Sequence, residues 1–193
     1  MQAPEPNRLF FALSPVEAVR NRVAATADFL CTQHTRGGRR IKPDRYHITL
    51  FFLGNHVPGP VEAAALKAAA RIEAPPFTLR LDQAGSFRNK LVPVWLGPSE
   101  LPAELVFLEQ LMRKTFAGLT QEQQPRFVPH LTILREAEKP LRKEPIEPID
   151  WPVREFVLIR SILHKPPRHY ERLRSYPLRG GPLPPEPKQF QLL

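Results

Sequence analysis

Two stretches of the chain each present a histidine and a threonine two positions apart within a run of apolar residues. His47 and Thr49 form the first pair, and His130 and Thr132 form the second. Alternate side chains of a β-strand point to the same face, so each pair shares one face of a predicted strand. One such pair alone is well explained as a hydrogen-bonded polar pair in the core. Packing gives no reason to repeat the pair, so the repeat favours chemistry.

The chemistry that best suits two imidazoles is general acid-base catalysis. An imidazole with an unperturbed pKa of about 6.5 acts in either protonation state near neutral pH. One ring would deprotonate a water that attacks phosphorus, and the other would protonate the departing sugar oxygen. Threonine hydroxyls on the same face would hold the non-bridging oxygens, where negative charge grows. Such a reaction requires no metal.

Two other kinds of site fit the sequence less well. A metal centre takes three or four ligands, and the carboxylates Asp44 and Glu136 have no ligand-like spacing to the histidines. A nucleophilic site would need a serine or cysteine beside a base, but the chain has no Gly-x-Ser-x-Gly motif. Its one cysteine, Cys31, is best explained as a small buried residue. A single cysteine also excludes disulfides within the chain and a cysteine-based zinc site.

The predicted elements around the two motifs repeat in order. Apolar runs at 8–13 and 91–96 predict strands, and helical periodicity follows each, over about 16–30 and 102–118. A loop and a histidine strand complete each copy. The chain therefore predicts two similar lobes related by a pseudo-twofold, each giving one His-Thr strand to a shared groove. A helix at 61–71, strands at 77–82, 154–163 and 170–178, and a connecting loop at 136–153 are also predicted.

Strict alternation also assigns the residues behind each motif. Leu50 and Phe52 are predicted to be buried opposite His47, on the core face of the first strand. The same rule puts Arg135 on the face opposite His130. Arg135 can therefore reach a phosphate beside His130 only if the strand contains a bulge or ends there.

Composition favours a polyanionic partner. The 193 residues include 28 Lys and Arg against 19 Asp and Glu, a formal net charge of +9. A basic surplus attracts phosphates and releases counterions, so nucleic acid is the leading candidate. A basic loop at 36–45 is either a solvated surface or a place that holds phosphates. No apolar run approaches the roughly 18 residues that span a membrane, and no signal peptide is recognisable, which predicts a cytoplasmic protein.

At these motifs the chain resembles a known family. Paired His-x-Thr motifs, together with the opening run at 8–13 and the closing Tyr170-Glu171-Arg172-Leu173, are similar to the two-histidine (2H) phosphoesterase superfamily. More narrowly, the chain resembles the RNA 2′,3′-cyclic phosphodiesterases, also called 2′-5′ RNA ligases. The resemblance covers residues 8–178. It implies an α+β fold of two lobes, with two antiparallel sheets flanking a central groove and helices outside.

The resemblance further implies a single two-lobed domain over residues 1–179, with a Pro-rich tail at 180–193 outside it. Members of the family hydrolyse a 2′,3′-cyclic phosphate at an RNA 3′ end to a 2′-phosphate, and some join or cleave 2′-5′ linkages. Carried over by motif, His47 is the proton donor and His130 the proton acceptor. Thr49 and Thr132 bind the phosphate, and Arg135 adds positive charge to it.

Three aromatic residues near the first motif are candidates for stacking an RNA base: Phe10, Tyr46 and Phe51. No cofactor or metal is implied, and a monomer is expected. Two alternatives stay open. One is a phosphodiesterase for small cyclic nucleotides or 2′-5′ oligonucleotides, and the other is a non-catalytic RNA-binding protein.

Overall fold

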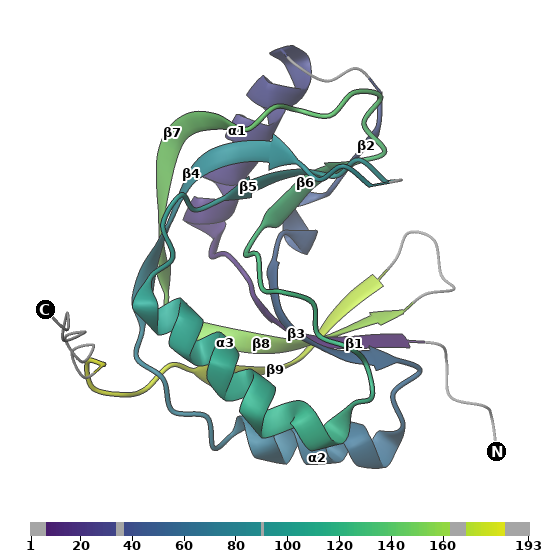
Figure 1. Cartoon of the computed structure of the whole chain (residues 1–193), viewed down its shortest axis with the longest axis vertical. Coiled ribbons are helices and arrows are strands. Elements are labelled where there is room, and N and C mark those ends of the chain that lie inside the picture. The colour runs from purple at the N-terminus through teal and green to yellow at the C-terminus, as the bar shows by residue number, and fades with distance from the viewer. Residues whose placement is uncertain (1–6, 34–36, 90, 163–168, 184–193) are drawn as a thin grey trace, which may run out of the picture.

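The computed structural model describes residues 7–33, 37–89, 91–162 and 169–183. It contains two antiparallel sheets, which lie one above the other in Figure 1. The four-stranded sheet has the spatial order β3 (Ile48–Asn55), β1 (Asn7–Leu13), β8 (Glu155–Ile162) and β9 (His169–Pro177). The five-stranded sheet has the order β2 (Arg39–Arg40), β6 (Leu131–Arg135), β5 (Val94–Gly97), β4 (Phe77–Ser86) and β7 (Glu144–Val153). Each histidine motif therefore leads into a strand of a different sheet, as predicted.

Each of the two long helices packs against the sheet that does not contain the strand preceding it in the chain. Helix α1 (Glu17–Gln33) follows β1 but contacts β6 and β7, whereas α3 (Ala103–Phe116) follows β5 but contacts β3. The buried residues of α1 recur at helical spacing: Val19, Val23, Ala27 and Leu30. Helix α2 (Gly59–Ala69) lies beside α3 under the four-stranded sheet (Figure 1). This exchange of helices joins the two lobes through a common core.

The strand pairing of the first lobe contains a bulge immediately after the His-Thr pair. Ala12 of β1 pairs with Thr49 of β3, but the next pair joins Phe11 to Phe51. Leu50 is thus an extra residue on β3, and both Leu50 and Phe51 are buried. An extra residue shifts the alternation of every side chain that follows it.

The second lobe repeats this bulge at the same place. Trp95 of β5 pairs with Thr132 of β6, and the next pair joins Val94 to Leu134, which makes Ile133 the extra residue. Each of these positions is 83 residues after its counterpart in the first lobe, the same interval that separates the two histidines. The predicted duplication therefore extends to the hydrogen-bonding register.

The prediction of a connecting loop at 136–153 was wrong. Strand β7 occupies ten of these residues and pairs along β4 at the edge of the five-stranded sheet. Its prolines, at 145, 148 and 152, suggested a loop because proline cannot donate to a strand ladder. At an edge strand a proline nitrogen can face away from the only neighbour, so the strand forms despite them.

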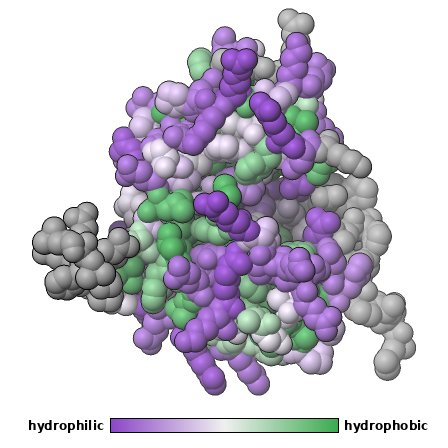
Figure 2. All heavy atoms as spheres, viewed as in Figure 1, coloured by the Kyte–Doolittle hydropathy of each residue, from purple (hydrophilic) through white to green (hydrophobic). Residues whose placement is uncertain are grey.

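Hydrophilic side chains cover much of the face seen in Figure 2, and a hydrophobic patch lies left of its centre, above α3. Within the described residues, no helix is long and apolar enough to cross a membrane. The predicted Pro-rich tail lies outside the described residues from residue 184 onward.

Candidate active site

The ring of His47 is oriented by the backbone of its own motif. Its Nδ1 lies 2.8 Å from the carbonyl oxygen of Arg45, at the end of the short 3-10 helix η1 (Pro43–Arg45). A carbonyl oxygen only accepts hydrogen bonds, so Nδ1 carries the proton. In the neutral ring Nε2 is then the nitrogen with a free lone pair, and it is the atom available to exchange a proton with a substrate.

The ring of His130 is held in the same way. Its Nδ1 lies 2.7 Å from the carbonyl oxygen of Val128, again two residues earlier in the chain. Among the described residues, no carboxylate hydrogen-bonds to either ring. Both imidazoles therefore have the same tautomer, and the backbone fixes it.

Burial strongly perturbs His47. The ring packs against Phe10 and Tyr170, with centroid distances of 5.1 Å and 5.6 Å. Desolvation lowers the pKa of His47 to about 4. The hydrogen bond to the Arg45 carbonyl opposes this shift, whereas the positive charges of Arg135, His130 and Arg45 lower the pKa further. Arg135 and His130 belong to the second motif, so charges of the second motif act on the histidine of the first.

His130 is perturbed in the same direction. The edge of its ring lies against Phe87, at a centroid distance of 4.8 Å. Burial lowers the pKa of His130, the carbonyl of Val128 opposes that change, and the charge of Arg135 reinforces it. In the free protein both rings are accordingly neutral near pH 7. One of them is ready to act as a base, and the other must gain a proton before it can act as an acid.

The bulge in β6 places Arg135 on the same side of the strand as Thr132. Leu131, Ile133 and Leu134 are buried in the core, whereas Thr132 and Arg135 are half-buried. Strict alternation alone would have put Arg135 in the core. A bulge in this strand was the condition for Arg135 to act beside His130, and the structure contains it. The positive charge of Arg135 lowers the pKa of both imidazoles.

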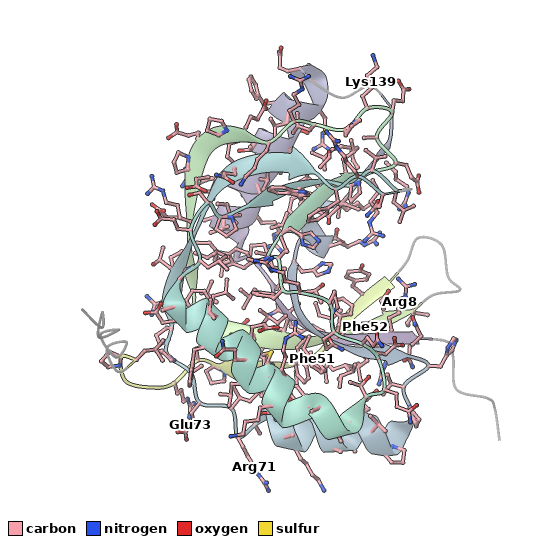
Figure 3. The ribbon with its side chains drawn as sticks, in the orientation of Figure 1. Arg8, Phe51, Phe52, Arg71, Glu73 and Lys139 are labelled. Carbon is pink, nitrogen blue, oxygen red and sulfur yellow. The ribbon has the colours of Figure 1, made fainter. Side chains whose placement is uncertain are left out.

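The equivalent bulge in β3 exchanges the expected places of Phe51 and Phe52, both labelled in Figure 3. Phe51 is 2% exposed and packs against Phe116 of α3 at a centroid distance of 5.4 Å, so it presents no free face to a base. Phe52, predicted to be in the core, is instead half-buried against the small cluster that contains Phe10, on the Thr49 side of the sheet. Aligning the two motifs would have identified Phe52 as the residue on the Thr49 side of the strand. It is 83 positions before Arg135, which lies on the Thr132 side.

The other two predicted stacking residues are also poorly exposed. Tyr46 is 2% exposed and belongs to the main core. Phe10 is 6% exposed, and its ring is covered by His47 and Tyr170. Tyr170, which was not predicted to be a site residue, is partly exposed, and the guanidinium of Arg45 lies 4.6 Å from its ring centroid.

Much of the predicted basic loop is engaged within the protein. Arg40 pairs with Asp28 of α1 at 2.8 Å, and Arg39 pairs with Glu136 at 3.4 Å. Both pairs are exposed and add little stability. The part of this segment nearest the site is Arg45, through its contact with Tyr170.

A glutamine joins the two motifs. The side chain of Gln124, in the segment that leads to His130, accepts a hydrogen bond from the backbone N–H of Phe52 and donates one to its carbonyl. These bonds, of 3.2 Å and 2.8 Å, occupy the free edge of β3 two residues after the extra residue Leu50. Arg113 of α3 holds the same segment by donating to the carbonyls of Gln124 and Pro125. No pattern in the sequence indicates this contact, which joins residues 72 positions apart.

Among the described residues, no three histidine, cysteine, aspartate or glutamate side chains form a group that could hold a metal ion. What the site does contain is a pair of backbone-oriented imidazoles with a threonine beside each and one guanidinium near both. This arrangement, on two sheets of a duplicated α+β fold, defines the class of two-histidine acid-base sites.

Comparison with known proteins identifies the family. The model of the 2′-5′ RNA ligase superfamily matches residues 14–164, and the chain belongs to this superfamily. An RNA 2′,3′-cyclic phosphodiesterase of Escherichia coli (strain K12) is 35% identical over 90% of this chain and 98% of its own length. A protein of the same name from Thermus thermophilus is 33% identical over 90% of this chain and 91% of its own length.

Solved structures agree. E. coli LigT in its apo form superposes with a TM-score of 0.77 at 32% sequence identity, covering 91% of this chain and 99% of LigT. LigT complexed with 3′-AMP gives a TM-score of 0.78, at 32% identity and with 90% and 99% coverage. The predicted family and fold class are confirmed.

Proposed function

We propose that the chain is an RNA 2′,3′-cyclic phosphodiesterase that converts a terminal 2′,3′-cyclic phosphate into a 2′-phosphate without a metal ion. The observation that carries the proposal is the pair of imidazoles, each with Nδ1 bound to a backbone carbonyl and Nε2 left to exchange protons. The relatives named RNA 2′,3′-cyclic phosphodiesterase support the choice of substrate. The net charge of +9 suits a polyanion.

In this mechanism the two histidines act on opposite sides of phosphorus. His130 Nε2 takes a proton from water as the water oxygen forms its bond to phosphorus. The bond from phosphorus to the ribose 3′ oxygen breaks, and His47 Nε2 gives that oxygen a proton. Thr49 and Thr132 donate hydrogen bonds to the non-bridging oxygens, which become more negative in the transition state. The product keeps its phosphate on the 2′ oxygen.

Arg135 has two effects in this scheme. Its charge favours binding of the phosphodiester anion, and in the free protein it helps to keep both rings neutral. When the anion binds, it offsets this positive charge and restores the affinity of His47 for a proton. The substrate thereby converts the free-state base His47 into an acid.

The ribose and base of the cyclic nucleotide would lie on the His47 side. Tyr170, whose ring contacts His47, is partly exposed, and so is Phe52, which packs against the same small cluster as Tyr170. Their rings are suited to stack a nucleobase, which every RNA sequence presents. They replace Phe10, Tyr46 and Phe51 as the stacking residues of the proposal.

We also propose that the two lobes act as one domain and one monomer. Both histidines come from the same chain, so a second copy has nothing to supply to the reaction. A cytoplasmic location agrees with the single cysteine, Cys31, because disulfides are rare in that compartment.

The test uses an oligoribonucleotide that ends in a 2′,3′-cyclic phosphate, in the presence of EDTA. We expect the wild type to yield a 2′-phosphate, and His47→Ala and His130→Ala each to lower the rate by about 10²- to 10⁴-fold. His56→Asn is the control, because His56 is exposed and outside the site and asparagine tolerates its positive φ of 55°. A 3′-phosphate product would reverse the roles of the two histidines. Full activity in either alanine variant, or loss of activity in EDTA, would refute the mechanism.

A further inference from the structure

Residues 121–128 lie between the short 3-10 helix η2 (Ala117–Leu119), which follows α3, and the second motif, without forming a helix or a strand. In Figure 1 they climb from the end of α3, past β3, toward β6 in the other sheet. Among the described residues, their backbone makes no hydrogen bond to another backbone group. Val128, at the end of this segment, nevertheless supplies the carbonyl that orients the ring of His130. The position of that ring therefore depends on the side chains that hold the segment.

Gln124 holds the segment against β3 in the manner of a neighbouring strand. Its amide oxygen accepts the backbone N–H of Phe52 at 3.2 Å, and its amide nitrogen donates to the Phe52 carbonyl at 2.8 Å. Residues paired across a sheet exchange the same two bonds, and β3 has no strand on this side. A third bond, of 3.3 Å, joins the amide nitrogen to the carbonyl of Glu122. The contact lies three residues after Thr49, so it ties the segment to the strand of the first motif.

Arg113 of α3 is a second anchor of the segment. It donates to the carbonyls of Gln124 and Pro125, at 3.3 Å and 2.5 Å. Its Nε donates to the carboxylate of Glu109, a residue that is 6% exposed. A buried carboxylate is costly without its partner, so the ion pair keeps the guanidinium in place. Because α3 packs against β3, both anchors fix the segment to the part of the fold that carries the first motif.

The chain between Gln124 and β6 is short and restricted. It comprises residues 125–130, and two of them, Pro125 and Pro129, have a fixed φ. Pro129 is buried, and its carbonyl oxygen would lie 3.1 Å from a Cβ added to Gly97 of β5. A shift of Gln124 would therefore be passed on to the residues before β6.

Such a shift would move His130 and spare the residues after it. The Val128 carbonyl accepts the Nδ1–H of His130 at 2.7 Å, so the orientation of the ring follows this carbonyl. Thr132 and Arg135 lie in β6, and the pairing of β6 with β5 holds them in place. The consequence for a reaction would thus be specific to one imidazole.

We propose that Gln124 is a positioning residue for His130. By docking residues 121–128 on β3, it sets the place of the Val128 carbonyl, and through it the tautomer of the His130 ring and its position relative to His47. Gln124 itself touches no reacting atom. The inference rests on the proposed function, because the position of one imidazole relative to the other matters only where both act on one phosphorus. In such a site a misplacement of about 1 Å lowers the rate by up to about 100-fold.

The kinetic test uses 2′,3′-cyclic AMP and a double-mutant cycle. We expect Gln124→Ala to lower kcat about 10- to 100-fold and to leave KM within about threefold, because the groups that hold the phosphate stay in place. In the His130→Ala background there is no ring to position, so the same substitution should change the residual rate by less than about twofold. Arg113→Lys keeps a positive charge beside Glu109 but loses the fork that reaches two carbonyls, and it should lower kcat as well.

Two control variants separate position from stability. Glu62→Gln weakens the bonds, of 2.6 Å and 2.7 Å, that join α2 to Arg160 under the four-stranded sheet. It should lower the melting temperature without changing kcat. Gln121→Ala removes a glutamine of the same segment at an exposed position, and it should change neither quantity.

Nitrogen NMR of the imidazoles is a readout that a general loss of stability does not move. The two nitrogens of a neutral ring differ in chemical shift, so the spectrum near pH 7 reports the tautomer of each histidine. In Gln124→Ala we expect His130 to become a mixture of tautomers. His47 should keep its wild-type tautomer, because its Nδ1 is bound to the carbonyl of Arg45 outside the segment, and it is the internal control.

The positioning role is refuted by an equal loss of rate in the wild-type and His130→Ala backgrounds, by a wild-type kcat in both Gln124→Ala and Arg113→Lys, or by an unchanged tautomer of His130. A loss of kcat in Glu62→Gln as large as that in Gln124→Ala would assign the effect to stability and refute it too. In each of these cases a wild type that hydrolyses the cyclic nucleotide leaves the proposed function standing. A wild type inactive on it overturns the proposed function, and this inference with it.

Discussion

Binding of a phosphodiester should raise the pKa of His47 by about three units. In the free protein that pKa is about 4, so only about one ring in a thousand carries the acid proton at pH 7. A single negative charge about 4 Å from the ring interacts with the imidazolium by about 4 kcal/mol at an effective dielectric constant of about 20. At about 1.4 kcal/mol per unit, this interaction moves the pKa to about 7. Roughly half of the rings would then be protonated in the complex.

The measurement is an NMR titration of the imidazole carbon-bound protons. The His130→Ala variant removes the base, so that 2′,3′-cyclic AMP persists during the titration, and its phosphodiester does not itself titrate near neutral pH. In this variant the charges that act on His47 are those of Arg45 and Arg135. The resonance of His56 serves as an internal control, because His56 is exposed and outside the site.

Two results would refute this reasoning. If His47 titrates near 6.5 in the free protein, the packing of Phe10 and Tyr170 does not desolvate the ring. If its pKa stays near 4 when the ligand is bound, the ring cannot supply a proton at neutral pH, and His47 cannot be the acid.

Three further predictions follow from contacts in the fold. Between pH 6.5 and 4 the unfolded chain binds a proton at His47 that the folded chain does not, so the free energy of unfolding should fall with decreasing pH by up to about 3 kcal/mol. Denaturant titrations at pH 4 and pH 7 should show a smaller change in this free energy for His47→Gln than for the wild type, and an equal change would contradict the lowered pKa. Phe51→Ala should lower the free energy of unfolding by about 3–5 kcal/mol and change substrate affinity little, whereas Phe52→Ala should mainly raise KM. Denaturation and steady-state kinetics measure these effects, and the opposite pattern would mean that the bulge is absent. Gln124→Ala removes two hydrogen bonds to Phe52, so it should lower the free energy of unfolding by about 1–3 kcal/mol and lower the melting temperature with it. Gln121→Ala, at an exposed position, should leave both unchanged. Equal melting temperatures for the two variants would show that the contact contributes nothing.

The elements of the fold and the identity of the two motifs were predictable because they depend on local patterns. Apolar periodicity located the strands and helices that flank His47 and His130, and the repeat of a polar pair in two apolar strands marked the site. The fold of two antiparallel sheets followed from the family resemblance, and the structure and its relatives confirm it.

Strict alternation could not predict which face of the strand each side chain occupies after the two motifs. A bulge adds one residue without any composition that marks it, and Leu50 and Ile133 look like ordinary strand residues. The prolines at 145, 148 and 152 led to the prediction of a loop where the structure has strand β7. The hydrogen bond that a proline removes from a sheet depends on whether its strand has one neighbour or two, and β7 has one. The contact of Gln124 with Phe52 depends on tertiary structure alone.

The hydrogen bonds that orient the two imidazoles have a consequence for how this site tolerates mutation. In a catalytic triad a carboxylate side chain fixes the tautomer of the histidine, so one substitution removes the orienting group. Here the partners are main-chain carbonyls at residues 45 and 128, which every amino acid possesses. Changes of side chain at these two positions leave the tautomers intact as long as the backbone keeps its path. Sequences around the two motifs can therefore diverge widely during evolution without losing the orientation of either base.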